Sequence, residues 1–257
     1  MSFVLHATSA GHGPRVVLVH GFTQTKASWA RLAGELEDSF EVVTVDLPGH
    51  GGSYVPLAGS GLDEAADALG ETGGQAFYVG YSLGGRLCLH LALRTPELVE
   101  RLVIVGAHPG ICDEASRLAR RLADDRLAAE LEEGGDESLA QFVDKWLEGP
   151  LFAHLSGEQA DRPSRLGNSA AGLAASLRTA GTGTQSPLWE RLSGLEMPVL
   201  VVVGARDDKF RPIAEATAQA IGRNAQLAVI ADAGHAACFE RPDTFLGLLG
   251  DFLAPGA

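Results

Sequence analysis

The chain has 257 residues, a length that suits one large α/β domain or two smaller ones. Apolar residues make up 46% of the chain, so it can bury a full hydrophobic core and does not have the composition of a disordered protein. The formal net charge of −13 opposes binding to nucleic acid and to anionic membrane surfaces.

The N-terminal segment and the cysteines favour a cytoplasmic protein. Residues 1–6 contain neither a basic leader nor a sustained apolar run, so we expect no secretory signal. Purely apolar stretches such as 199–203 are far shorter than the ~20 residues of a membrane-spanning helix. An odd number of cysteines without metal-ligand spacing favours packed, reduced thiols at Cys88, Cys112 and Cys238. We expect no membrane or nucleic-acid partner, and the sequence predicts no oligomeric state.

Short runs rich in β-branched residues recur along the chain, at 15–19, 40–45, 76–79, 102–105, 199–203 and 227–230. Such runs are typical of strands buried in a parallel sheet. Helical patterns lie between them, including 29–36, 84–94, 213–221 and 244–252. The alternation predicts an α/β fold with a doubly wound, mostly parallel sheet flanked by helices.

The segment from about 111 to 189 breaks this alternation. It has a helical pattern, is rich in Ala, Leu, Arg and Glu, and lacks strand-like runs. Glycine and proline residues at 134–135, 149–150 and 181–183 divide it into several helices. Because strand patterns resume at Val199, we predict a single domain over 1–257 with a helical cap inserted at about 111–189.

A Gly-x-Ser-x-Gly motif occupies 80–84, between a predicted strand and a predicted helix. A sharp turn at this place holds the serine in a strained, exposed position, and the glycines allow close packing of the backbone. We therefore interpret Ser82 as a nucleophile. A serine hydroxyl reacts poorly at neutral pH, so it needs a histidine that is oriented by a carboxylate.

The other two members of this triad are expected after the last two predicted strands. Asp207 follows one of them and His235 follows the other, which gives the chain order Ser, Asp, His that this fold uses. Asp208 and Asp232 are rival acids. Asp207 is preferred because it lies three residues past Gly204, where its strand ends.

The His-Gly-Phe loop at 20–22 follows the first predicted strand, where we expect a backbone N–H of an oxyanion hole, from Phe22. The second donor is expected to be the N–H of Leu83. His50, in the tight loop 46–51, is interpreted as structural. No glycine-rich phosphate loop or nucleotide fingerprint occurs, so we predict no cofactor, and no metal site is expected.

Through these residues the chain resembles the α/β-hydrolase superfamily over nearly its whole length. A narrower set of motifs is similar to the 2-succinyl-6-hydroxy-2,4-cyclohexadiene-1-carboxylate synthase family, namely 80–86, 108–110, Trp146 with 150–152, Arg165 with Asn168, and 204–210. This resemblance implies a cofactor-independent lyase of menaquinone biosynthesis. In that family the triad abstracts a proton, and pyruvate is expelled from a polycarboxylate intermediate.

The narrower resemblance also implies three substrate-binding arginines, Arg86, Arg120 and Arg165. Planar guanidinium groups bind carboxylates through two parallel hydrogen bonds, which suits such a substrate. Arg86 lies four residues after Ser82, about one helical turn further on. The cap arginines are also ordinary charges of a solvated helix, so the choice among them stays open at Arg117, Arg120, Arg121 and Arg126.

Two aromatic residues, Tyr81 and Trp146, are expected to line the substrate pocket, although packing in the core explains Trp146 as well. The alternative function is a serine hydrolase that acts on an ester or a C–C bond of a carboxylated small molecule. A non-catalytic binding module on the same fold is disfavoured because all three triad positions are filled.

Overall fold

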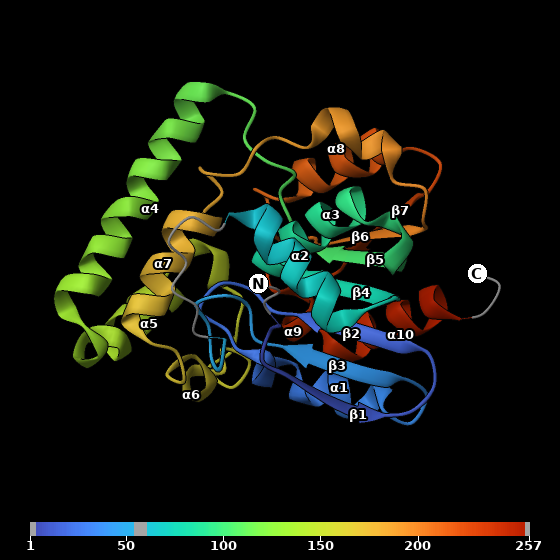
Figure 1. Ribbon diagram of the computed structural model, residues 1–257, viewed down its shortest axis with the longest axis horizontal. Helices are drawn as coiled ribbons and strands as arrows, with labels where there is room; N and C mark the ends of the chain where they lie inside the picture. Colours follow the sequence, from blue (N-terminus) through green and yellow to red (C-terminus); the bar gives the residue numbers. More distant parts are fainter. Residues whose placement is uncertain (1–3, 54–60, 255–257) are drawn as a thin grey trace.

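The computed structural model describes residues 4–53 and 61–254, so residues 1–3 of the segment considered for a leader lie outside it. Its centre is a seven-stranded sheet of order β1-β3-β2-β4-β5-β6-β7 (Figure 1). β1 is antiparallel to β3, and every other neighbouring pair is parallel, which confirms the predicted fold class. The strands are β1 (Ala7–Gly11), β2 (Arg15–Val19), β3 (Glu41–Val45), β4 (Ala76–Tyr81), β5 (Val99–Val105), β6 (Val199–Gly204) and β7 (Ala225–Ile230).

Helices cover both faces of the sheet (Figure 1). Those of one face are α2 (Leu62–Gly73), α3 (Leu83–Arg94) and α8 (Arg211–Ile221), and those of the other are α1 (Ala30–Leu36), α9 (Ala237–Glu240) and α10 (Pro242–Leu253). Successive side chains of a strand point to opposite faces, so Val17 joins the first apolar cluster and Leu18 the second. The sheet is therefore buried between two hydrophobic layers.

The two edges of the sheet differ from the sequence prediction. β1 is not predicted, because its Ala-Thr-Ser-Ala-Gly sequence has no apolar run, and it forms by pairing with β3. The prediction that the last strand is buried is wrong, since Leu227 and Val229 of β7 are 39% and 42% exposed. β7 lies at the edge of the sheet, where neighbouring elements cover a strand less completely than they cover a central one.

Between β5 and β6 the chain leaves the sheet and forms the cap segment, residues 111–189. Its helices are α4 (Glu114–Gly134), α5 (Leu139–Leu147), α6 (Arg162–Arg165) and α7 (Ala170–Ala180). α4 ends at the predicted glycine pair, where Gly135 has a φ of 59°, a conformation that glycine adopts at low cost. α4 and α7 lie side by side (Figure 1), and the cap helices share an apolar cluster that includes Leu131, Val143 and Leu173.

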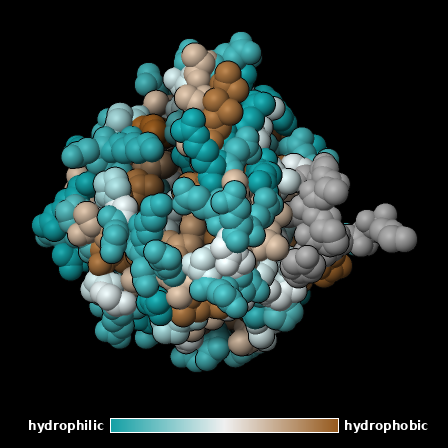
Figure 2. Space-filling model, turned by 90° about the vertical axis from the view of Figure 1, so that its left-hand side faces the viewer, coloured by the Kyte–Doolittle hydropathy of each residue, from teal (hydrophilic) through white to brown (hydrophobic). Residues whose placement is uncertain are grey.

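Short 3₁₀ helices lie at Lys26–Trp29, Pro96–Leu98, Asp136–Ser138, Pro150–Phe152 and Trp189–Gly194. The face of the molecule on the α4 side is mostly hydrophilic, with scattered apolar side chains (Figure 2). Over the two described ranges, no helix has both the length and the hydropathy that crossing a membrane requires.

Candidate active site

Ser82 lies in the turn between β4 and α3, with a φ of 51° and a ψ of −106°. Few residues other than glycine adopt such angles, so the backbone here is strained. The surrounding structure holds the turn, since the Ser82 N–H donates to the Val105 carbonyl at 2.8 Å. Close packing also requires the glycine that follows, because a Cβ on Gly84 would collide with the Val19 carbonyl. The turn directs the Ser82 hydroxyl toward His235.

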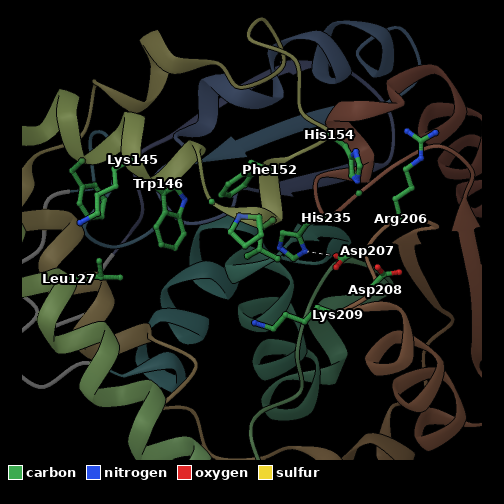
Figure 3. A pocket seen from close by; sticks show the side chains of 15 residues that line it. Leu127, Lys145, Trp146, Phe152, His154, Arg206, Asp207, Asp208, Lys209 and His235 are labelled. Carbon is green, nitrogen blue, oxygen red and sulfur yellow. Dashed lines mark hydrogen bonds and ion pairs between the residues drawn. The ribbon is translucent and has the colours of Figure 1, made fainter.

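The imidazole of His235 lies between Ser82 and Asp207. Its Nε2 is 3.3 Å from the Ser82 Oγ. Its Nδ1 is 2.8 Å from the Asp207 Oδ2, a contact that Figure 3 shows as a dashed line. His235 and Asp207 are both buried. The other oxygen of Asp207 accepts the Phe210 N–H at 3.1 Å, which orients the carboxylate. This chain of contacts can move a proton from the serine hydroxyl to the imidazole.

The two rival acids lie elsewhere. Asp208 is exposed, and His235 hydrogen-bonds to the Asp207 carboxylate instead. Asp232 is exposed and forms an ion pair with Arg206 at 2.5 Å. The structure therefore brings together Ser82, Asp207 and His235.

A buried carboxylate that the sequence analysis does not identify holds the loop around His235. The Glu240 oxygens accept the Gly234 N–H at 2.6 Å and the Ala236 N–H at 3.0 Å, so the backbone is fixed on both sides of the histidine. The Glu240 carbonyl also accepts a hydrogen bond from Gln159 of the cap segment at 3.0 Å. An acidic residue in an otherwise apolar short helix is the signal that could have identified it.

The residues expected to form an oxyanion hole, Phe22 and Leu83, line the same pocket as the nucleophile. Leu83 is the first residue of α3, so its N–H has no partner within the helix. His20 fixes the Phe22 loop, because its Nδ1 donates to the Gly21 carbonyl at 2.8 Å and its Nε2 accepts the Leu47 N–H at 3.0 Å. Burial lowers the pKa of His20 to about 4, which keeps the ring in the neutral form that these bonds require.

The inner pocket is a cavity of about 80 Å³ beside Ser82, and Arg86 forms part of its wall. Arg86 is only 7% exposed, and it donates to the Ala180 carbonyl at 2.7 Å and to the Gln185 Oε1 at 3.1 Å. Both acceptors are neutral, and no carboxylate of the described residues accepts a hydrogen bond from Arg86. Burial, with the nearby charge of Arg120, lowers the pKa of Arg86 to about 9. A buried cation without a bonded anion is costly, so the pocket favours an anionic ligand.

Of the arginines that α4 carries, the inner pocket has Arg120 in its wall. Its Nε donates to the Asp124 Oδ1 at 2.8 Å, which leaves both terminal nitrogens for another ligand. Asp124 is buried, and its second oxygen, Oδ2, has no hydrogen-bond partner within the described part of the chain. Burial raises the pKa of Asp124, while the neighbouring Arg120 and Arg86 oppose this rise.

The outer pocket is a larger cavity, of about 590 Å³, between the cap segment and His235 (Figure 3). Its apolar wall includes Trp146, whose ring lies 6.3 Å from the Phe142 ring and meets the Phe22 ring edge-on at 5.1 Å. Four residues line both pockets, namely Trp146, Leu151, Lys209 and His235. The two pockets are therefore adjacent and share part of their walls.

Arg165 and Tyr81 lie behind these pockets, and neither is part of their walls. Arg165 is 1% exposed, and it donates to the Ala160 carbonyl at 2.7 Å and to the Thr23 hydroxyl, which joins the cap segment to the loop after β2. Tyr81 is 3% exposed, and its ring packs 5.5 Å from that of His235. Their positions favour structural roles over the substrate contact that the family resemblance implies for Arg165 and over the pocket-lining position expected for Tyr81.

The sequence analysis does not predict a role for some other pocket residues. His108 and Lys209 line the inner pocket and belong to the motifs quoted for the family, but the motifs give them no role. Gln185, which accepts a hydrogen bond from Arg86, has no local signal at all. Only the folding of the cap segment back onto the sheet brings it there.

Within the described ranges, no group of three or more His, Cys, Asp or Glu side chains is arranged to hold a metal ion. The three cysteines are free thiols. Cys88 and Cys238 are buried, and burial raises the pKa of both, so they behave as packing groups.

Sequence comparison adds relatives along the whole chain. Residues 16–248 match the model of the alpha/beta hydrolase family. A 2-succinyl-6-hydroxy-2,4-cyclohexadiene-1-carboxylate synthase from Salmonella paratyphi B is 32% identical over 254 residues, which cover 96% of this chain and 97% of the relative. A protein of the same name from an Enterobacter species is 34% identical over 247 residues, which cover 93% of this chain and 92% of the relative.

Solved structures show a similar extent of likeness. MenH from S. aureus superposes with a TM-score of 0.88 at 30% identity, over 97% of each chain. A thermophilic esterase from Thermogutta terrifontis, with malate bound, superposes with a TM-score of 0.81 at 25% identity, over 97% of this chain and 92% of that one.

Proposed function

We propose that this chain, an enzyme that belongs to the α/β-hydrolase family, eliminates pyruvate from a polycarboxylate cyclohexene intermediate of menaquinone biosynthesis. The observation that carries this proposal is the buried guanidinium of Arg86, which stands in the wall of the Ser82 pocket with neutral hydrogen-bond partners. Relatives that cover nearly the whole chain are named for a synthase of this pathway. We place the enzyme in the cytoplasm, as one domain over 1–257 with a cap at about 111–189.

The charges around the inner pocket suit a carboxylated small molecule. Arg86, Arg120 and Lys209 line it, and Asp124 pairs with Arg120 and attracts Arg86 electrostatically. The net charge of −13 repels anions from the protein as a whole, so this local excess of cations is what attracts the substrate. A carboxylate would relieve the unpaired charge of Arg86 through a two-point contact.

The triad supplies the base for the elimination. His235 Nε2 accepts the proton of the Ser82 hydroxyl, and Asp207 stabilises the imidazolium that forms. The Ser82 oxygen removes a proton from a C–H bond of the substrate. The electrons of that bond form a double bond, and the bond to the leaving group breaks. The leaving group takes the proton held by His235 and departs as pyruvate, which leaves Ser82 with the proton of the former C–H bond and restores the triad. The Phe22 and Leu83 N–H groups stabilise the developing oxyanion.

Substitution of Arg86 tests the proposal through substrate selectivity. Arg86→Ala should lower kcat/KM for pyruvate release from the cyclohexene intermediate about 30-fold to several thousandfold. This range corresponds to a loss of roughly 2 to 5 kcal/mol of transition-state binding, because the substrate carboxylate is left unpaired in a buried site. A small neutral ester should be turned over at nearly the wild-type rate. Arg86→Lys should recover only part of the loss, since an ammonium lacks the planar fork.

Arg94→Ala is the matched control, because Arg94 lies on the same helix and pairs with the exposed Asp67. It should leave both rates unchanged, and circular dichroism should show every variant folded. Equal losses on both substrates, or none on either, would make Arg86 a structural residue and count against the lyase.

A serine hydrolase acting on an ester or C–C bond of a carboxylated substrate is the second candidate. It is favoured by the structural likeness to an esterase with malate bound, a dicarboxylate. The two functions differ in covalent chemistry, because a hydrolase of this kind acylates its serine whereas the elimination does not. Mass spectrometry of rapidly quenched enzyme should therefore find no acyl adduct on Ser82 during turnover of the cyclohexene intermediate.

A further inference from the structure

His108 is a second histidine in the wall of the inner pocket, and the mechanism above does not use it. It follows β5 at the carboxyl edge of the sheet, the same edge that carries Ser82. Its ring meets those of Trp189 and Phe210 edge-on, with centroids 6.2 and 6.4 Å apart. The aromatic contacts restrict the orientation of the imidazole.

The hydrogen bonds of His108 determine which ring nitrogen carries the proton. The Gly110 N–H donates to Nδ1 at 2.9 Å, so Nδ1 is an acceptor. A neutral imidazole has one N–H, which must then be at Nε2. Burial, together with the cations Arg86, Lys209 and Arg120, lowers the pKa of His108 to about 4, so the ring is neutral near pH 7.

The Nε2–H of His108 has no protein acceptor among the described residues. Two other histidines at this edge of the sheet, His20 and His235, differ, because each uses both ring nitrogens in hydrogen bonds with the protein. His108 thus presents an unused donor at the wall of a pocket. An acceptor atom of a ligand would satisfy it.

The position of His108 is tied to that of Arg86 through one buried amide. The Gln185 Nε2 donates to the His108 carbonyl at 3.3 Å, and the Gln185 Oε1 accepts from the Arg86 Nη1 at 3.1 Å. Gln185 is 1% exposed, so water does not compete for these bonds. A neutral donor and a charged donor are therefore held together in the wall of one small pocket.

We propose that the Nε2–H of His108 donates a hydrogen bond to an oxygen of the carboxylate that Arg86 binds, which makes His108 a specificity-determining residue for anionic substrates. The inference rests on the proposed function only in taking that ligand to be a carboxylate. A neutral donor suits this place, because a further cation here would be repelled by Arg86, Lys209 and Arg120.

Kinetics of His108 variants test the contact. His108→Leu should raise KM for the cyclohexene intermediate about 10- to 100-fold, the usual effect of losing a hydrogen bond to a charged group, with little change in kcat. His108→Gln keeps an N–H donor at similar reach and should recover most of the loss. His12→Leu is the control, since His12 is exposed in the turn between β1 and β2 and lines neither pocket. An unchanged KM in His108→Leu would overturn the proposal.

The result can be separated from that of the proposed function. If the wild-type chain hydrolyses a carboxylated ester and releases no pyruvate from the intermediate, the same variants are measured on that ester and on its neutral analogue. A KM effect confined to the charged ester supports the His108 contact although the lyase has failed. A selective loss of kcat/KM on the anionic substrate in Arg86→Ala, with an unchanged KM in His108→Leu, would support the lyase and show that His108 does not contact the substrate.

The protonation state can be observed directly by NMR of the full chain with ¹⁵N-labelled histidine. At pH 7 the His108 resonances should be those of the Nε2–H tautomer. Saturation with pyruvate, the probe carboxylate, should shift them, and His108→Gln assigns them by their disappearance. A Nδ1–H tautomer would overturn the proposal.

Discussion

The carboxyl edge of the sheet and the cap segment contribute to one pocket in different ways. The sheet edge supplies Ser82, Asp207 and His235 from loops that backbone hydrogen bonds hold in place. The cap segment supplies Arg120 and Trp146 from helices that pack on an apolar cluster of their own. The reacting groups thus lie on the sheet edge, whereas the recognition groups come from both regions, Arg86 and His108 from the sheet side and Arg120 and Trp146 from the separately packed cap. We expect variants of the triad and of its supporting residues to change kcat and variants of the cap to change KM.

The largest expected effect comes from the serine at the sheet edge. Ser82→Ala should fold normally and reduce kcat by at least about a thousandfold, because the members of a triad act as a unit. Ser176→Ala is the matched control, since Ser176 is a buried cap residue in the wall of the same pocket. Steady-state kinetics of both variants measure the effect. A loss of kcat in Ser176→Ala as large as that in Ser82→Ala, or near-native turnover in Ser82→Ala, would contradict the assignment of the reacting groups to the sheet edge.

A smaller effect on kcat is expected from the carboxylate behind His235. Glu240→Gln retains one acceptor oxygen but replaces the other with an amide N–H that cannot accept the second backbone hydrogen bond. The loop should loosen and kcat should fall about 10- to 100-fold, by analogy with the loss of a charged hydrogen bond, while KM stays near the wild-type value. Asp243→Asn, an exposed acid just after the same loop, should change neither. A rise in KM alone would show that Glu240 acts on binding.

On the cap side, Asp124→Asn should act on KM. The carboxylate holds Arg120 through its Nε, so its replacement should leave the guanidinium less well oriented and raise KM about 10-fold, the value of one charged hydrogen bond. The neighbouring Asp125→Asn serves as the control. Kinetics with the carboxylated substrate and with a neutral ester should show the effect on the former alone. A fall in kcat with unchanged KM would contradict the division between cap and edge.

The smallest expected difference between the two regions is in how the free energy of unfolding depends on pH under acidic conditions. Burial lowers the pKa of His20 to about 4 and that of His50 to about 3, both at the sheet edge, while His154 of the cap is exposed. Between the ordinary value of 6.5 and these values the unfolded chain binds more protons, so the free energy of unfolding falls as pH falls, by up to about 1.4 kcal/mol per pH unit for each histidine.

Denaturant titrations from pH 7 to 4.5 measure this slope. His50→Asn keeps a donor for the Pro48 carbonyl and should make the slope shallower, because one titrating group is gone. His154→Asn should leave the slope unchanged. A slope that is the same in wild type and His50→Asn would mean that His50 is not held neutral in the folded protein.

Most of the sheet could be predicted because its signals are local. The β-branched runs of the central strands and the glycines around Ser82 reflect constraints within a few residues, which any fold with a buried parallel strand and a sharp turn must meet. β1 escaped prediction because pairing with β3, and not its own composition, makes it a strand. The exposure of β7 was not predicted for a related reason, since the sequence of a strand does not determine whether it lies at the edge or the centre of the sheet.

The sequence by itself determined the α/β fold, the elbow at Ser82 and the candidate acid and base, because spacing along the chain limits where strand ends can place such residues. Only the tertiary structure decided which arginines reach the pocket. Arg86 and Arg120 line it, whereas Arg165 lies behind it and ties the cap to the core. The structure also decided that the Nε2–H of His108 has no protein acceptor and that the Glu240 carboxylate holds the loop around His235. Both depend on contacts between distant segments or on local backbone geometry. Residue types reveal which chemistry is possible, but burial and hydrogen-bond partners, which long-range packing sets, decide which groups remain available for a ligand.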